Sequence, residues 1–283
     1  MKRVNCLISF CCLLLLVAPV WGQGQAGRCP CVKDAGYVVD RMENDHPGFT
    51  RNLRKRKSEY RELRAYVLRS AADIEDQETC LKLLQEYLAF FRDGHLGISI
   101  PDPDRVPKSD RNLTKDLFLE QLNDNTHYLR LPTFYKSYWE ELDSFYGEVE
   151  PQLAGMEHLI VDVRNNTGGG PRMYLQILKA LKRKRTAPER VSLLYNSACA
   201  SACEHFVVDL GRKSHVTTYG ENSYGALGYG DIQQITTPNC QFRFDLPSRC
   251  FGSYLKYEIK GVPPDVRLEK GGDSWLQQLI EGE

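Results

Sequence analysis

The chain has 283 residues, and its 37 Lys and Arg are balanced by 37 Asp and Glu, so its formal net charge at pH 7 is zero. This balance disfavours nucleic acid or an anionic membrane surface as the main partner. Hydrophobic residues make up 42% of the chain. A chain of this length and composition can bury a proper core, in one large domain or in a small domain and a larger one.

Residues 1–24 have the layout of a secretory signal peptide. Lys2 and Arg3 precede an apolar run from about Cys6 to Val20, and small and polar residues follow it. The run is shorter than the roughly 20 residues that a spanning helix needs, so a cleaved signal is favoured over a membrane anchor. We therefore expect a secreted or periplasmic protein with no membrane span after cleavage.

Ten cysteines are present, three of them in the signal segment, and seven follow: Cys29, Cys31, Cys80, Cys199, Cys203, Cys240 and Cys250. An odd number in an oxidising compartment leaves a free thiol or an intermolecular bond. Cys240 and Cys250 bracket QFRFDLPSR, which we interpret as two short strands around a turn, so they are the predicted disulfide. The Cys29-x-Cys31 spacing matches no zinc pattern. We expect no metal and no other cofactor.

Residues 28–108 are predicted to form a small helical bundle that ends in the loop of His95. LRAYVLRSAADI and TCLKLLQEYLAFF repeat apolar residues at intervals of three and four, which is the pattern of amphipathic helices. The basic run RNLRKRKSEYREL is interpreted as a solvated helix face. The Pro- and Asp-rich stretch SIPDPDRVPKSDRN then indicates a linker.

Residues 109–283 are predicted to form the second domain, in which strands and helices alternate. HYLRLPTF, EHLIVDVR, ERVSLLYN and SHVTTYG indicate strands, and the helices between them are FYKSYWEELDSFYGEVEPQL, PRMYLQILKALKRK and ACEHFVVDLGR. Strands that alternate with helices of this length form right-handed crossovers and a largely parallel sheet. A β-rich tail and the short helix DSWLQQLIEGE follow. The predicted fold class is therefore α/β.

Two strand-to-helix junctions are candidates for chemistry. VDVRNNTGGGPR puts three glycines between a buried strand and a helix, and such a turn can expose N–H groups toward an anion. A plain turn also explains this stretch. In NSACASACEHF, Ser201 lies at a helix N-terminus, where the helix dipole favours an oxyanion. On this segment alone, a helix-capping serine is the simpler interpretation.

A serine nucleophile needs a base, and the chain has six histidines: His46, His95, His127, His158, His205 and His215. His205 is four residues after Ser201 and shares its helix face. To meet it, however, the hydroxyl would have to point away from a substrate cleft. His95, in FFRDGHLGI, follows a helix at the edge of the predicted sheet domain. There it can face a cleft between two lobes, although an ordinary loop histidine is the alternative.

Five motifs occur in the order and approximate spacing of the C-terminal processing peptidase family: DGHLGI, YLRLPTF, LIVDVRNNTGGG, SACASACEHF with TYGENSYGA, and EIKGVPPDVRL. The match runs from about Arg92 to Leu268 and most resembles the tricorn-like branch, which also contains retinoid-binding-protein-like modules. The resemblance implies a crotonase-like β/α core. It also implies that Ser201 in SACE is the nucleophile and that Glu204 is a motif residue.

The same resemblance implies the remaining catalytic roles. In the tricorn-like branch, the histidine of an Asp-Gly-His-like motif is the base, and a glutamate before the last Gly-Val orients it. The matching positions are His95 and Glu258. Gly168 or Gly169 would supply one oxyanion donor and the amide of Ala202 the other. Two backbone N–H groups of this kind are what a tetrahedral intermediate requires.

The chain also departs from the family pattern. Ala226 occupies the position of the lysine base of the processing branch, so a Ser/Lys mechanism is not available. Gly94 stands where the tricorn-like branch can place a serine. Only about 30 residues separate His95 from Tyr128, too few for the PDZ domain of processing peptidases, since a domain needs at least about 50 residues.

These features predict a secreted or periplasmic serine peptidase that hydrolyses a peptide or protein by a Ser/His/Glu mechanism. The alternative is a non-catalytic binding module of the same fold that holds a peptide or an apolar ligand. A thiol enzyme that uses Cys199 or Cys203 is less favoured than structural or disulfide roles for both. Asn112 and Asn165 begin Asn-x-Thr glycosylation acceptors, and a sugar on Asn165 would lie beside the proposed oxyanion turn.

Overall fold

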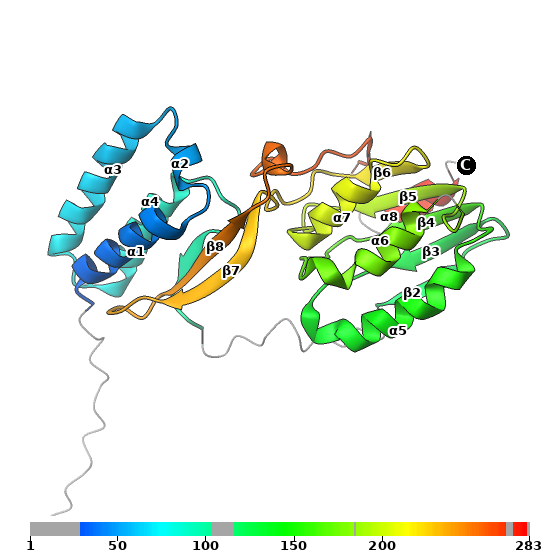
Figure 1. The fold of residues 1–283 in the computed structure, drawn as a ribbon, viewed down its shortest axis with the longest axis horizontal. Coiled ribbons are helices and arrows are strands. Elements are labelled where there is room, and N and C mark those ends of the chain that lie inside the picture. The colour runs from blue at the N-terminus through cyan, green and yellow to red at the C-terminus, as the bar shows by residue number, and fades with distance from the viewer. Residues whose placement is uncertain (1–28, 103–115, 184, 270–273, 282–283) are drawn as a thin grey trace, which may run out of the picture.

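The structure is a computed structural model that describes residues 29–102, 116–183, 185–269 and 274–281. The predicted signal peptide and the acceptor Asn112 lie outside these residues. Figure 1 shows a helical lobe and a sheet lobe with a long β-hairpin between them. Among the described residues, no helix is both long and apolar enough to cross a membrane.

The N-terminal lobe consists of helices α1 (Cys31–Asp45), α2 (Phe49–Asn52), α3 (Lys57–Ser70) and α4 (Gln77–Ala89). The α4 helix begins after Asp76, whose side chain accepts the N–H of Thr79 at 2.8 Å, as an N-cap does. A disulfide between Cys31 and Cys80 joins α1 to α4. The predicted helical region is thus confirmed in its main elements.

A three-stranded antiparallel sheet packs on these helices. Its strands are β1 (Gly97–Ser99), β8 (Arg243–Cys250) and β7 (Tyr229–Thr236), in that order. Phe242, Phe244 and Leu246 lie in the same buried cluster as the helical core. A hairpin from the C-terminal part of the chain therefore completes the N-terminal lobe (Figure 1).

The predicted disulfide between Cys240 and Cys250 is wrong. Cys240, at the hairpin loop, bonds to Cys29, and Cys250 at the end of β8 is a free thiol. The error is in the secondary structure, because RFDLPSRC forms one continuous strand, β8, rather than two strands around a turn. The 8 residues of β8, at about 3.3 Å each, hold the two cysteines well beyond disulfide reach.

The sheet lobe contains a six-stranded sheet in the order β2 (Phe118–Gln121), β3 (Thr126–Arg130), β4 (His158–Asp162), β5 (Arg190–Tyr195), β6 (Val216–Gly220) and β9 (Val266–Arg267). From β3 to β9 all neighbours are parallel, and β2 is antiparallel. Every residue of β4 is buried, as expected for a parallel strand covered on both faces. The α/β fold class is confirmed.

Helices cover both faces of this sheet. Leu159 and Val161 of β4 pack in the core shared by α5 (Trp139–Val149), α6 (Leu175–Lys182) and α7 (Ala202–Leu210). Ile160 points to the other face, where Trp275 of α8 (Ser274–Glu281) packs. Because the strands are parallel, the loops after β4 and β5 emerge at the same edge, which is where such sheets bind ligands.

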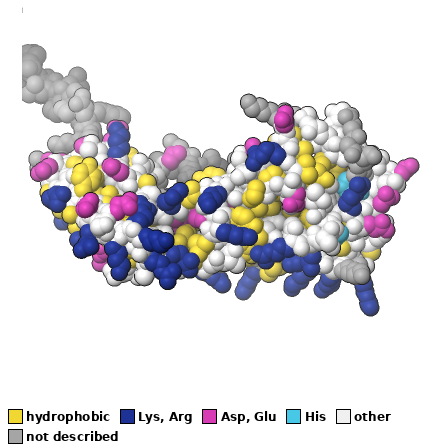
Figure 2. All heavy atoms as spheres, turned by 90° about the horizontal axis from the view of Figure 1, so that it is seen from above, with side chains coloured by type: hydrophobic (Ala, Val, Ile, Leu, Met, Phe, Trp, Pro, Cys, Tyr) yellow, Lys and Arg dark blue, Asp and Glu magenta, His cyan; other side chains and the backbone are white. Residues whose placement is uncertain are grey.

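Figure 2 shows Lys and Arg side chains spread along one face from lobe to lobe. Arg51, Arg54 and Lys55 of the basic run are exposed. The run is thus solvated, although it spans the end of α2 and the turn before α3 as well as the start of α3.

Candidate active site

Ser201 lies in the sharp turn between β5 and α7. It is the N-cap residue of α7, with φ 59° and ψ −120°, a conformation that is costly for any residue other than glycine. Backbone strain of this kind, on a strand-to-helix turn, is what lifts a nucleophilic hydroxyl out of an α/β sheet in other hydrolases. Cys199 and Cys203 form a disulfide across this turn, so neither offers the thiol that a thiol enzyme would need.

The side chain of Glu204 fixes the turn that contains Ser201. Its Oε2 accepts the N–H groups of Ser201 and Ala226, both at 2.9 Å. Its Oε1 accepts the hydroxyl of Ser223 and the N–H of Gly225, both at 2.6 Å. Burial raises the pKa of Glu204, and these four hydrogen bonds oppose that rise. With both oxygens occupied, Glu204 is a structural residue, as the motif implies.

The glycine turn after β4 lies against Ser201. A Cβ on Gly168 would be 2.8 Å from Cβ of Ser201 and 3.0 Å from the amide nitrogen of Ala202. The N–H of Gly168 is already donated to Oδ1 of Asn166, at 2.9 Å. Asn166 is fully buried, and its Nδ2 donates to the carbonyl of Leu131 at 3.0 Å. Sequence reasoning missed Asn166, although its place in NNTGGG was a usable signal.

The amide of Gly169 points elsewhere. In the parallel bridge between Phe134 and Gly169, the N–H of Phe134 is donated to the carbonyl of Gly168, and the N–H of Gly170 is donated to the carbonyl of Phe134. The N–H of Gly169 therefore faces away from Phe134. Among the described residues, neither this N–H nor that of Ala202 has a hydrogen-bond acceptor. Both amides are therefore free to bind a ligand, and that of Ala202 is adjacent to Ser201 in the chain.

The loop that carries His95 follows α4. The backbone N–H of His95 is donated to Oδ1 of Asp93 at 2.8 Å. The imidazole Nδ1 is buried without a hydrogen-bond partner. Burial lowers the pKa of His95, and the nearby charge of Asp93 raises it. Among the described residues, no hydrogen bond joins His95 to Ser201.

Glu258 contacts the His95 loop through the backbone rather than through the ring. Its Oε1 accepts the N–H of Gly94 at 2.7 Å. Its Oε2 accepts the N–H groups of Leu227 and Gly228, at 2.9 Å and 2.5 Å. Burial raises the pKa of Glu258, and these three bonds oppose the rise. The carboxylate thus fixes the loop on which the candidate base sits.

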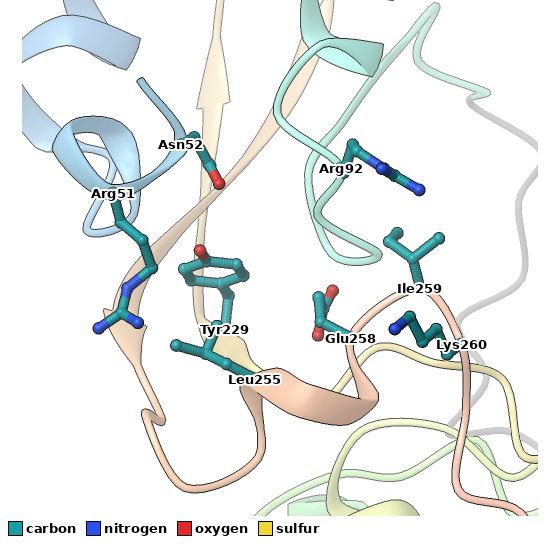
Figure 3. A pocket seen from close by; sticks show the side chains of 8 residues that line it. All are labelled: Arg51, Asn52, Arg92, Tyr229, Leu255, Glu258, Ile259 and Lys260. Carbon is teal, nitrogen blue, oxygen red and sulfur yellow. The ribbon is translucent and has the colours of Figure 1, made fainter. Parts of the chain in front are cut away.

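The segment of residues 223–228, which we term the linking segment, connects the two candidate groups. Glu204, beside Ser201, binds its first half, and Glu258, beside the His95 loop, binds its second half. Figure 3 shows Glu258 next to a cavity of about 260 Å³. It is lined by the helical lobe, by the start of β7 and by the segment of residues 255–260, through Arg51, Asn52, Arg92, Tyr229, Leu255, Glu258, Ile259 and Lys260.

Two of the departures from the family pattern, Gly94 and Ala226, lie next to each other in the structure. A Cβ on Gly94 would lie 2.8 Å from Cβ of Ala226, a distance too short for two carbon atoms. The absence of a side chain at position 94 therefore lets Ala226 pack against the histidine loop.

His205 does not serve as the base. Its Nε2 lies 2.7 Å from the carbonyl oxygen of Leu227, and its ring stacks on Tyr254 at 4.2 Å between centroids. Burial lowers its pKa. The contact with Leu227 assigns His205 to holding the linking segment in place.

Comparison with known proteins supports the interpretation of the fold. Residues 125–190 match the model of peptidase family S41. No curated protein sequence matches the chain. The fold is similar to that of a candidate peptidase from Parabacteroides merdae, with 16% identity, a TM-score of 0.60, and coverage of 87% of this chain and 92% of that one.

Two further structures share the fold. One is mature CPAF, with 10% identity, a TM-score of 0.58, and coverage of 90% and 98%. The other is a lipoprotein from Streptococcus agalactiae, with 14% identity, a TM-score of 0.55, and coverage of 89% and 96%. The family match covers residues 125–190, and the solved structures share the fold over most of the chain. The resemblance found in the motifs is confirmed at this level.

Proposed function

We propose that the protein is an exported serine peptidase in which Ser201 is the nucleophile, His95 the general base and Glu258 the residue that positions the base. The observation that carries the proposal is the surroundings of Ser201. Its strained turn adjoins the free amide of Ala202, and Gly168, whose neighbour Gly169 also has a free amide, packs against it. A turn of this kind matches the needs of acyl transfer.

In the proposed mechanism, Oγ of Ser201 attacks the peptide carbonyl while His95 takes its proton. The N–H groups of Gly169 and Ala202 stabilise the oxyanion, and each such donor is typically worth about 100- to 1,000-fold in rate. His95 then returns the proton to the leaving amine, and water releases the acyl group by the same steps in reverse. The lowered pKa of His95 keeps its imidazole neutral, as a base must be.

Export is supported by the cysteines. Three disulfides lie within the described residues, namely Cys29–Cys240, Cys31–Cys80 and Cys199–Cys203. Disulfides persist in oxidising compartments and are rare in the cytosol. We therefore propose a secreted or periplasmic protein that acts on peptide or protein substrates there.

A fluorophosphonate probe tests the assignment, because it reacts only with an activated serine. The wild-type protein should be labelled and Ser201→Ala should not. The matched control is Ser197→Ala, which removes an exposed serine four residues away and should be labelled like the wild type. Equal labelling of wild type and Ser201→Ala would refute the role of Ser201.

The non-catalytic binding module is the second candidate, and one observation favours it. His95 makes no hydrogen bond to Ser201, and its Nδ1 is buried without a partner. Catalytic hydrogen bonds often tighten only when substrate binds, so the geometry is compatible with both functions. A mixed peptide library, analysed by mass spectrometry for new termini, separates them. Retention of intact peptides without cleavage would establish the binding module.

A further inference from the structure

His46 and Asp93 form a buried pair behind the loop of His95. Nε2 of His46 lies 3.0 Å from Oδ2 of Asp93, and neither side chain has any exposed surface. The N–H of Gly48 is donated to Nδ1 of His46 at 3.1 Å. Because Nδ1 accepts this bond, the proton of the neutral ring sits on Nε2 and is donated to Asp93.

The second oxygen of Asp93 leads directly to the candidate base. Oδ1 of Asp93 accepts the N–H of His95 at 2.8 Å, while the preceding N–H, that of Gly94, is donated to Glu258. Two carboxylates therefore hold consecutive amides of the loop. Asp93 is in turn held by His46, which lies at the C-terminal end of α1 in the helical lobe.

Aromatic side chains fix the ring of His46. Its centroid lies 5.8 Å from that of Phe91 and 5.2 Å from that of Tyr229. The turn after His46 also depends on Tyr229, because a Cβ on Gly48 would collide with the phenol ring. The backbone carbonyl of Tyr229 and the charge of Asp93 both raise the pKa of His95, against the lowering by burial. His46 thus contacts both residues that raise the pKa of His95.

We infer that His46 and Asp93 are positioning residues for His95, through which the helical lobe holds the base in place. This inference rests on the proposed function. When His95 takes the proton of Ser201, its ring becomes positive, and a fixed carboxylate nearby stabilises that charge. Glu258 already accepts three backbone N–H groups. Asp93 therefore supplies charge and orientation from the loop itself, without a bond to the ring.

The variant His46→Leu tests the inference, because it leaves the Asp93 carboxylate without its buried donor. A displacement of the base of about 1 Å can cost about a hundredfold in rate. We expect kcat on a fluorogenic peptide to fall by about ten- to a hundredfold, with KM changed by less than about twofold. His46→Gln can still donate an N–H to Asp93, and we expect it to recover most of kcat.

His158→Leu is the matched control. His158, at the start of β4, is also fully buried, and its Nε2 lies 2.8 Å from the hydroxyl of Ser192. Its loss should lower stability but leave kcat per folded molecule unchanged. If His46→Leu does not fold, the isosteric Asp93→Asn takes its place, and the same fall in kcat is expected.

The inference is overturned if the folded variant keeps the wild-type kcat, if His46→Gln gives no recovery, or if His158→Leu loses as much. A measurement that does not depend on catalysis tests the inference separately from the proposed function. In ¹⁵N-histidine NMR, the ring signals of His95 should shift in His46→Leu and stay in place in His158→Leu. Unchanged signals refute the positioning role, whereas a wild type that the fluorophosphonate does not label refutes only the peptidase.

Discussion

The N–H of Gly94 donates a 2.7 Å hydrogen bond to Oε1 of Glu258, residues that are 164 positions apart in the chain. The same carboxylate holds the linking segment, and Glu204 ties the other half of that segment to Ser201. The buried carboxylate of Glu204, the half-buried one of Glu258 and the segment between them thus set the position of the histidine loop relative to the serine turn.

Gly94→Ser should displace the His95 loop, because its Cβ would lie 2.8 Å from that of Ala226. We expect fluorophosphonate labelling of Ser201 to slow by at least about tenfold. Adding Ala226→Gly should restore much of the rate. Gly97→Ser is the control, since a Cβ there meets nothing within 4 Å. Failure of the second substitution to rescue the first would contradict the steric explanation.

Glu258→Gln should harm both activity and stability. The carboxylate accepts three backbone N–H groups, and the NH₂ of glutamine would have to face at least one of these donors. We expect the free energy of unfolding to fall by about 1–3 kcal/mol and kcat to fall by at least about tenfold. Denaturant titration and steady-state kinetics measure the two effects. Glu157→Gln, at an exposed site, should change neither, and equal effects from both would argue against the role.

Loss of the Cys199–Cys203 disulfide, which flanks Ser201, should lower activity more than it lowers stability. The Cys199–Cys203 loop spans 4 residues and the Cys31–Cys80 loop 49, so chain entropy assigns them about 2 and about 4 kcal/mol. We expect the double alanine variant of the first pair to lose most of its kcat. The double alanine variant of the second pair should unfold more easily yet keep kcat per folded molecule. If the first variant kept its kcat and the second lost it, the Cys199–Cys203 disulfide would have no role in holding Ser201.

The pH profile should report the environment of His95. Burial lowers its pKa from the ordinary 6.5, the charge of Asp93 raises it, and His205 lowers it. A base must be neutral to act, and a lowered pKa keeps it neutral in more acidic solution. The acidic limb of kcat/KM should therefore have its midpoint below 6.5. Asp93→Asn removes the charge that raises the pKa, so it should move the midpoint lower still. A midpoint above 6.5, or an upward shift in the variant, would contradict this picture.

Local sequence patterns were sufficient for much of the fold. The alternation of apolar strands and amphipathic helices predicted the parallel sheet, and the glycine turn and Ser201 fall where their segments placed them. Such patterns succeed because the periodicity of a strand or helix is set by residues a few positions apart. The same local reasoning failed between Cys240 and Cys250, where an apparent turn is the middle of a long strand.

The tertiary structure alone decided which distant residues meet. Cys29 bonds to Cys240 across 211 positions, and His46 reaches Asp93 across 47. It also decided that Glu258 binds backbone amides and that the amide of Gly169, rather than that of Gly168, stays free. The type of chemistry could be predicted from the residues alone, because serine, histidine and carboxylate side chains have characteristic acid–base properties. Their mutual positions depend on how the two lobes pack, and no pattern within a single segment records that.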